Sequence, residues 1–259
     1  MQKRLDILLV EKENLSRTKA QNYIAEGCVF VDGKQIKKAS FMVEDSVNIA
    51  LTKHDDYVSR GAYKLLGATH KFEINLKDKT VLDLGASTGG FTQVCLQNGA
   101  KKVYAVDVGE GQLDQKLKED NRVIDLSKTD VRDLRNENLP DIDFIVGDLS
   151  FISLTVILPK IKELFGTGID MVLLFKPQFE CGREIAKKYH GIIKNKEIHK
   201  KILKNFVNFV KLLGFSLNNI VVSPIKGGDG NIEYLVYFSK RGNEKFDIDQ
   251  IVDDAFSSK

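Results

Sequence analysis

The chain has 259 residues and a net charge of +3, and its 42% hydrophobic and 29% charged residues are proportions typical of a globular protein. No apolar run approaches the roughly 18 residues that a membrane span needs, and Asp6 and Glu11 interrupt the N-terminal apolar stretch too early for a secretory signal, so we expect a cytoplasmic protein without a membrane partner. Cys28, Cys95 and Cys181 are far apart, which argues against a disulfide framework and a zinc site.

Residues 1–50 have the pattern of a small α+β unit. Leucines at helical spacing predict a first helix, and a second helix is expected to run to about Glu26, where Gly27 can end it. The segment "CVFVDGKQI" then alternates around Asp32 and Gly33, a strong hairpin signal. Residues 1–40 carry eight basic side chains against five acids. This surplus favours a unit that meets phosphate.

The segment "RLDILLVEKENLSRTKAQNYIAEGCVFVDGK" resembles the S-four RNA-binding domain, the S4 domain. The resemblance implies that basic side chains on the two helices bind folded RNA through its shape and phosphates. The candidate RNA-binding residues are Arg4, Arg17, Lys19, Lys34 and Arg60. A small helical unit with incidental basic residues is the alternative.

Residues 51–57, "LTKHDDY", are polar and without periodicity, and we interpret them as a linker to a larger domain over 58–259. In that domain "TVLDLG", "KVYAVD", "DFIVGD" and "DMVLLFK" are apolar runs that end in polar residues, with helical patterns between them. Such runs are typical of parallel strands buried on both faces, with functional side chains at their carboxyl ends. We therefore predict an α/β fold with a Rossmann-like sheet, preceded by the small α+β domain.

The segment "VLDLGASTGGFTQV", residues 81–94, is a glycine-rich turn from strand to helix. A dinucleotide fingerprint starting at Gly85 needs glycines at positions 87 and 90, but Ser87 occupies the first of these. A ligand with an adenosine but no phosphate, S-adenosylmethionine, fits better, and Asp83 offers an acid to its cationic groups. The candidate cofactor-binding residues in this segment are Asp83, Gly85, Ser87, Gly89, Gly90 and Phe91.

Further acids follow the next strands. Asp107 ends the second strand, with Val108 after it, and its carboxylate can accept both ribose hydroxyls. Asp130 follows a short strand near 123–125 and is placed to meet the adenine amino group. Each acid alone has an alternative as a helix cap or turn former. Their succession beside the glycine turn favours the cofactor, with Asp148 as a further contact.

Methylation of a ribose 2′-hydroxyl needs in-line placement and a group that accepts or stabilises the leaving proton, and it requires no metal. The candidate catalytic residues are Lys64, Asp148, Lys176 and Glu233. Asp148 and Lys176 end consecutive predicted strands, so we expect them to face one crevice. Each residue also has a structural alternative. Lys64 could be a solvated helix lysine and Asp148 a turn former. Lys176 could be a lysine at the core edge and Glu233 an exposed strand residue.

The order Lys-Asp-Lys-Glu resembles the FtsJ-like ribose 2′-O-methyltransferases. With "YVSRGAYKL", "AVDVGEGQL", "DLSFISL", "LFKPQFE" and "GNIEYLVYF", the whole chain resembles the TlyA family, historically called hemolysin A. This implies methylation of cytidine ribose in 23S rRNA, and in the longer type also in 16S rRNA. It implies that Lys176 either removes the hydroxyl proton as a base or stabilises the negatively charged oxygen. The sequence leaves open which of these two roles it has. Tyr63 departs from many relatives, which have two consecutive glycines and a leucine in this segment.

Two questions stay open at this stage. Residues 184–211 contain eight lysines against two glutamates, and 244–259 contain five acids against two lysines, so the basic stretch either meets phosphate or is a solvated helix face. The alternatives to an rRNA methyltransferase are a small-molecule O-methyltransferase, a membrane-active hemolysin and a ribosome assembly factor that only binds. The oligomeric state is open between monomer and dimer.

Overall fold

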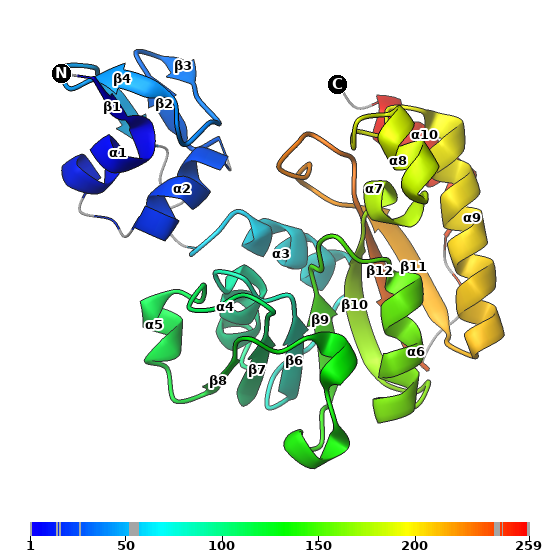
Figure 1. Cartoon of the computed structure of the whole chain (residues 1–259). Coiled ribbons are helices and arrows are strands. Elements are labelled where there is room, and N and C mark those ends of the chain that lie inside the picture. The colour runs from blue at the N-terminus through cyan, green and yellow to red at the C-terminus, as the bar shows by residue number, and fades with distance from the viewer. Residues whose placement is uncertain are drawn as a thin grey trace. The chain divides into compact units, whose positions relative to one another are not determined.

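The computed structural model describes residues 2–13, 15, 17–25, 27–51, 57–240, 244 and 246–257, without the side chains of Lys19 and Asn138. The chain divides into two compact units, Met1–Asp56 and Tyr57–Lys259 (Figure 1). Most of the expected linker, residues 52–56, lies outside the described residues.

The N-terminal unit packs two helices on two small sheets. The helices are α1 (Leu5–Glu13) and α2 (Arg17–Ala25), β1 (Gln2–Arg4) pairs with β4 (Met42–Glu44), and β2 (Val29–Val31) lies between β3 (Lys34–Gln35) and β5 (Ile49–Leu51). The predicted hairpin is confirmed, because β2 and β3 pair antiparallel across Asp32 and Gly33, which both have positive φ. Leu5, Leu8 and Leu9 are buried in its core, as their helical spacing predicts.

The second unit is built on a sheet of seven strands in the order β11-β12-β10-β9-β6-β7-β8. The strands are β6 (Thr80–Leu84), β7 (Lys102–Val106), β8 (Val123–Leu126), β9 (Phe144–Gly147), β10 (Asp170–Phe175), β11 (Leu217–Val222) and β12 (Tyr234–Phe238). The strands from β10 to β8 are parallel, and β12 runs antiparallel to both β10 and β11. The predicted Rossmann-like sheet is confirmed.

Helices cover both faces of this sheet (Figure 1). They are α3 (Gly61–Lys71), α4 (Gly90–Gln97), α5 (Gln115–Lys118), α6 (Leu154–Phe165), α7 (Pro177–Glu180), α8 (Arg183–Lys188), α9 (Lys196–Leu213) and α10 (Ile248–Ser257), with 3-10 turns at Val131–Asp133 and Asn136–Asn138. Within the described residues, none of the helices combines the length and the apolar character that a membrane crossing requires.

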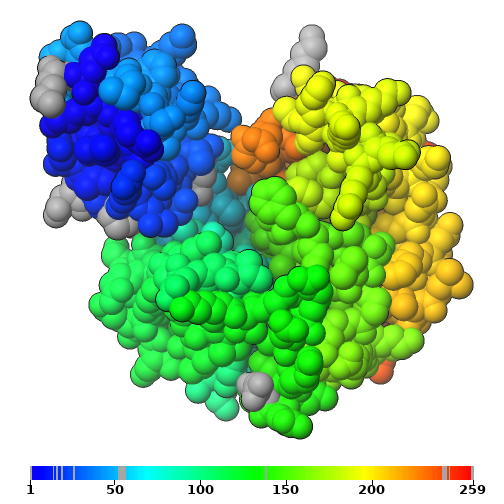
Figure 2. Space-filling view, viewed as in Figure 1, coloured from blue at the N-terminus to red at the C-terminus, as the bar shows by residue number. Residues whose placement is uncertain are grey.

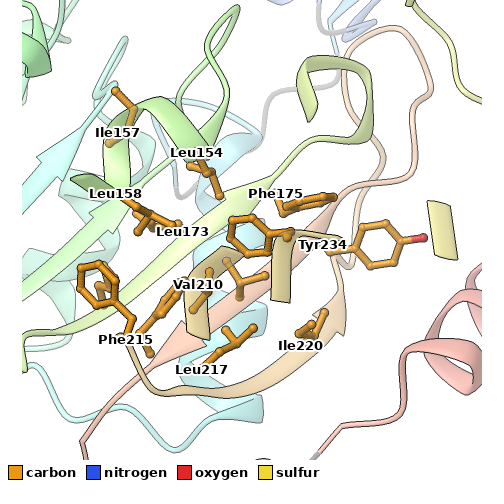
Figure 3. Packing of buried hydrophobic residues seen from close by; sticks show 14 of the residues in the cluster. Leu154, Ile157, Leu158, Leu173, Phe175, Val210, Phe215, Leu217, Ile220 and Tyr234 are labelled. Carbon is orange, nitrogen blue, oxygen red and sulfur yellow. The ribbon is translucent and has the colours of Figure 1, made fainter. Parts of the chain in front are cut away.

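Side chains of the strands alternate between two cores, as the period of two dictates. Leu173 and Phe175 of β10 pack with α6 and α9 in one core (Figure 3). Val172 and Leu174 of the same strand pack with α3 and α4 in the other. Both faces are buried, which explains why the sequence of β10 is a continuous apolar run.

Candidate active site

Four candidate catalytic residues come from four different elements. Lys64 lies on α3, Asp148 follows the last residue of β9, Lys176 follows the last residue of β10, and Glu233 precedes β12. Because β12 runs antiparallel to β10, its first residue lies at the sheet edge where β9 and β10 end. The topology therefore brings the four residues to one edge, as expected for Asp148 and Lys176.

The four side chains form a row of alternating charge. Lys176 Nζ lies 2.6 Å from Asp148 Oδ1, Lys64 Nζ lies 3.1 Å from Asp148 Oδ2, and Lys64 Nζ lies 2.9 Å from Glu233 Oε2. Lys64, Lys176 and Glu233 are buried, at 8%, 6% and 2% exposure. Lys64 and Glu233 are thus neither a solvated helix lysine nor an exposed strand residue. Two cations and two anions balance, which makes this burial tolerable.

Burial and neighbouring charges shift the pKa values of Lys64 and Asp148 in opposite directions. Burial of the Lys64 ammonium would lower its pKa, but the Asp148 and Glu233 carboxylates outweigh it and the pKa is raised. Burial of Asp148 would raise its pKa, but Lys176 and Lys64 outweigh it and the pKa is lowered. Both groups are therefore charged at neutral pH, and Asp148 is a fixed negative charge between two lysines.

Lys176 has one donor left for a ligand. An ammonium has three N–H donors. One lies at Asp148, and a second donates to Ser150 Oγ at 2.8 Å. Ser150 was not among the candidate residues, although it stands two positions after Asp148 at a strand end, where a functional side chain is common. Its role depends on tertiary placement, which the sequence does not display.

An exposed aromatic ring lies beside this lysine. Phe151 is 91% exposed and has φ +64°, which is a strained conformation for a bulky residue. Its ring centroid lies 5.2 Å from that of Phe179, and Lys176 Nζ lies 5.7 Å from the Phe179 ring. An apolar ring held in water at an active-site edge is a surface on which a planar ligand can stack.

The glycine turn adjoins the row of charges. Gly85 has φ +79°, and a Cβ there would lie 3.1 Å from the backbone oxygen of Asp148. A Cβ on Gly90 would lie 2.9 Å from the backbone nitrogen of Ala62, near the start of α3. A Cβ on Gly89, which has φ +96°, would clash with Leu117. The glycines are therefore required for close packing, a reason beyond the ligand access inferred from sequence.

Asp107 has the geometry of a hydroxyl acceptor. The backbone N–H of Ser87 donates to its Oδ2 at 2.8 Å, and that of Gly109 donates to its Oδ1 at 2.7 Å. These bonds fix the carboxylate, and no lysine or arginine of the described residues forms an ion pair with it. Val108 beside it is 69% exposed. A fixed carboxylate next to an exposed apolar residue fits the ribose and base of a nucleoside, as S-adenosylmethionine requires.

The other predicted cofactor residues lie differently. Asp83 is fully buried and accepts a hydrogen bond from Thr92 Oγ1 at 2.6 Å, and burial raises its pKa to about 7. Its Oδ1 has no hydrogen-bond partner among the described atoms. Phe91 is buried in the core, so only its backbone can face a ligand. Asp130 caps a 3-10 turn and forms an ion pair with Arg132 at 2.6 Å, the capping role the sequence left open.

The predicted RNA-binding residues of the N-terminal unit include an ordered arginine pair. Arg4 Nη2 lies 2.8 Å from Oδ2 of the fully buried Asp6, and Arg17 Nε lies 3.8 Å from the same oxygen. Arg4 Nε also donates to Asp6 Oδ1 at 2.9 Å, and Gln21 donates to Asp6 Oδ2 at 2.8 Å. The arginine side chains remain 40% and 64% exposed, so one buried carboxylate orients two cations toward solvent.

The remaining candidates are more scattered. Lys34 is exposed on β3, Arg60 occupies the position before α3 in the second unit, and the Lys19 side chain lies outside the described residues. Among the described residues, no cluster of three or more His, Cys, Asp or Glu could hold a metal ion.

Comparison with known protein families assigns each of the two units to a family. The FtsJ-like methyltransferase family matches residues 57–240, and the S4 domain family matches residues 3–49. The chain belongs to the FtsJ-like methyltransferase family. In this chain the methyltransferase domain therefore follows an S4 domain, and the predicted S4 resemblance is confirmed.

Curated relatives place this methyltransferase within the predicted TlyA family. The 23S rRNA (cytidine-2′-O)-methyltransferase TlyA of Campylobacter jejuni is 37% identical over 92% of this chain and 99% of its own. Hemolysin A of Brachyspira hyodysenteriae is 44% identical over 86% of this chain and 93% of its own. A solved structure from Streptococcus thermophilus, also named as a hemolysin, covers 99% of this chain and 96% of its own with a TM-score of 0.77 and 36% identity.

Proposed function

We propose that this protein transfers a methyl group from S-adenosylmethionine to the 2′-hydroxyl of a cytidine in ribosomal RNA, with 23S rRNA as the substrate and 16S rRNA as a further candidate. The observation that carries the proposal is the contact between Gly85 and the backbone of Asp148, because it joins the nucleoside-binding turn to the row of charges. The donor and the acceptor hydroxyl can then meet at one sheet edge. The Campylobacter jejuni relative is named for this reaction on 23S rRNA.

When bound, S-adenosylmethionine supplies an electrophilic methyl group on a sulfonium. In this proposal Asp107 holds the ribose hydroxyls, and Val108 packs against the base. Lys176 directs its third N–H at the 2′-oxygen and stabilises the negative charge that develops there, while the hydroxyl proton passes to solvent water and the methyl group leaves the sulfonium, which becomes a neutral thioether. Asp148 and Ser150 fix the position of that ammonium. Lys64 and Glu233 in turn orient Asp148.

The S4 domain and Phe151 support an RNA substrate over a small molecule. The ordered pair Arg4 and Arg17 offers two exposed guanidiniums, which suit phosphate oxygens. The exposed Phe151 ring offers a stacking surface for an unpaired base, a contact common in RNA recognition. A small-molecule methyltransferase would need neither feature.

The test is to map 2′-O-methyl groups on rRNA from cells with and without the gene, and to add the purified protein and S-adenosylmethionine to the unmodified ribosomal subunits. We expect a cytidine that is methylated only when the gene or the protein is present. Identical maps in both strains, with no transfer by the purified protein, would refute the function.

A further inference from the structure

The lysines of the basic stretch, residues 184–211, differ in whether they form ion pairs. On α9, Lys196 Nζ lies 2.9 Å from Asp253 Oδ1, and Lys204 Nζ lies 2.8 Å from Asp249 Oδ2. Lys200 Nζ lies 2.7 Å from Asp253 Oδ1. These acids belong to α10, so the acidic C-terminal helix neutralises this part of the basic stretch. Lys196, Lys200 and Lys204 of α9 therefore serve intramolecular pairing.

The preceding helix, α8, is different. Arg183, Lys187 and Lys188 are exposed, and within the described part of the chain no carboxylate forms an ion pair with any of them. Lys188 Nζ lies 5.8 Å from the centroid of the adjacent Tyr189 ring. Segment 183–194 contains four Lys or Arg residues and a single acid, Glu184. We call Arg183, Lys187 and Lys188 the α8 basic surface.

This surface is close to the active site along the chain. Lys176 caps α7, and α8 begins seven residues later, so Arg183 lies within about 25 Å of Lys176 even if the chain between them were fully extended. Figure 1 shows α7 and α8 together beyond the end of β10, and in Figure 2 the yellow residues of this region form part of the molecular surface. An RNA strand with a ribose at Lys176 could reach the α8 basic surface within a few nucleotides.

We propose that the α8 basic surface binds the phosphate backbone of the RNA substrate, next to the methylated nucleotide, whereas the paired lysines Lys196, Lys200 and Lys204 of α9 do not. The inference rests on the proposed rRNA substrate and adds a contact on the methyltransferase domain to the one expected from the S4 domain. Exposed, unpaired cations release counterions when they meet phosphates, and lysines already paired with acids release few.

Two double variants with equal charge loss test this proposal. Lys187→Gln with Lys188→Gln removes two unpaired lysines, and Lys196→Gln with Lys204→Gln removes two paired ones. Binding to protein-free rRNA from cells without the gene is measured over a series of salt concentrations. The first variant should flatten the slope of log affinity against log salt by about 1 for each lysine, about 2 in total, and the second should keep the wild-type slope.

Further measurements separate this inference from the function on which it rests. Calorimetry with S-adenosylmethionine checks that each variant is folded, and Lys187→Arg with Lys188→Arg should keep the wild-type slope because the charge remains. If wild type methylates rRNA but both glutamine variants have the wild-type slope, the α8 inference is wrong. The inference is also wrong if Lys187→Gln with Lys188→Gln binds intact ribosomal subunits more weakly than wild type but binds protein-free rRNA equally well. The surface would then contact a ribosomal protein. Failure of wild type to methylate rRNA refutes the proposed function instead.

Discussion

Replacement of Lys176 by alanine separates catalysis from binding at one side chain. The change removes the N–H donor that we propose to be aimed at the 2′-oxygen, while Lys64 remains the partner of Asp148 at 3.1 Å and of Glu233 at 2.9 Å, so each carboxylate keeps a partner and the fold should persist. A positioned proton-transfer or charge-stabilising group contributes about 10²- to 10⁴-fold, which corresponds to about 2.7–5.4 kcal/mol of transition-state free energy. Methyl transfer should fall by that factor.

Single-turnover methylation of unmodified rRNA measures this loss, and calorimetry with S-adenosylmethionine should show nearly wild-type cofactor affinity. Lys200→Ala is the matched control, because Lys200 is also an ion-paired lysine with little exposure, 15%, but lies on α9. It should methylate at the wild-type rate. Lys176→Arg should not restore the activity, because the planar fork of a guanidinium cannot replace an ammonium between Asp148 and Ser150. Near wild-type transfer by Lys176→Ala would refute the reasoning.

Three other predictions address the cofactor, the RNA and stability. Asp107→Ala should weaken S-adenosylmethionine binding by about 1.5–3 kcal/mol in calorimetry, with far less effect on RNA binding, and unchanged cofactor affinity would exclude the ribose contact. Asp6→Asn removes a negative charge, yet it should weaken RNA binding in a filter-binding assay, because Arg4 and Arg17 lose the carboxylate that orders them. Tighter binding would mean that net charge alone determines RNA affinity. Burial raises the pKa of Asp83 in the folded protein to about 7 from its ordinary value of 3.8, so the wild-type protein loses stability as the pH rises through this window. Asp83→Asn has no carboxyl group to ionise, and its melting temperature relative to wild type, measured by circular dichroism, should therefore increase from pH 5 to pH 8. A constant difference would contradict the raised pKa.

The strands of the methyltransferase domain could be predicted because both faces of the sheet are buried. A parallel strand covered on two sides needs apolar residues at every position, and β10 shows this in "MVLLF". The carboxyl end of such a strand is exposed to the crevice, so Asp148 and Lys176 could be expected to lie together. Their spacing of 2.6 Å depends on the lateral order of β9 and β10, which no local pattern displays.

Contacts between distant segments could not be predicted. Lys204 and Asp249 are far apart in the chain, and only the packing of α10 on α9 makes them a pair. Asp6 is an acid in a basic unit, and its full burial under Arg4 and Arg17 follows from the packing of α1 against α2. In both cases the residue types were visible in the sequence, but their partners are set by tertiary structure.

Asp148 makes two kinds of contact in the candidate site, and they depend on different parts of the residue. Its carboxylate holds both lysines, and its backbone contacts Gly85 and donates to the carbonyl of Leu84 at 3.0 Å. A methyl donor with a positive sulfonium would be repelled by Lys176 and Lys64 alone. The Asp148 carboxylate lies between them, which reduces this repulsion at the point where donor and acceptor must approach. In the proposed mechanism, the negative charge of Asp148 therefore allows a cationic donor and the cationic Lys176 to share one sheet edge.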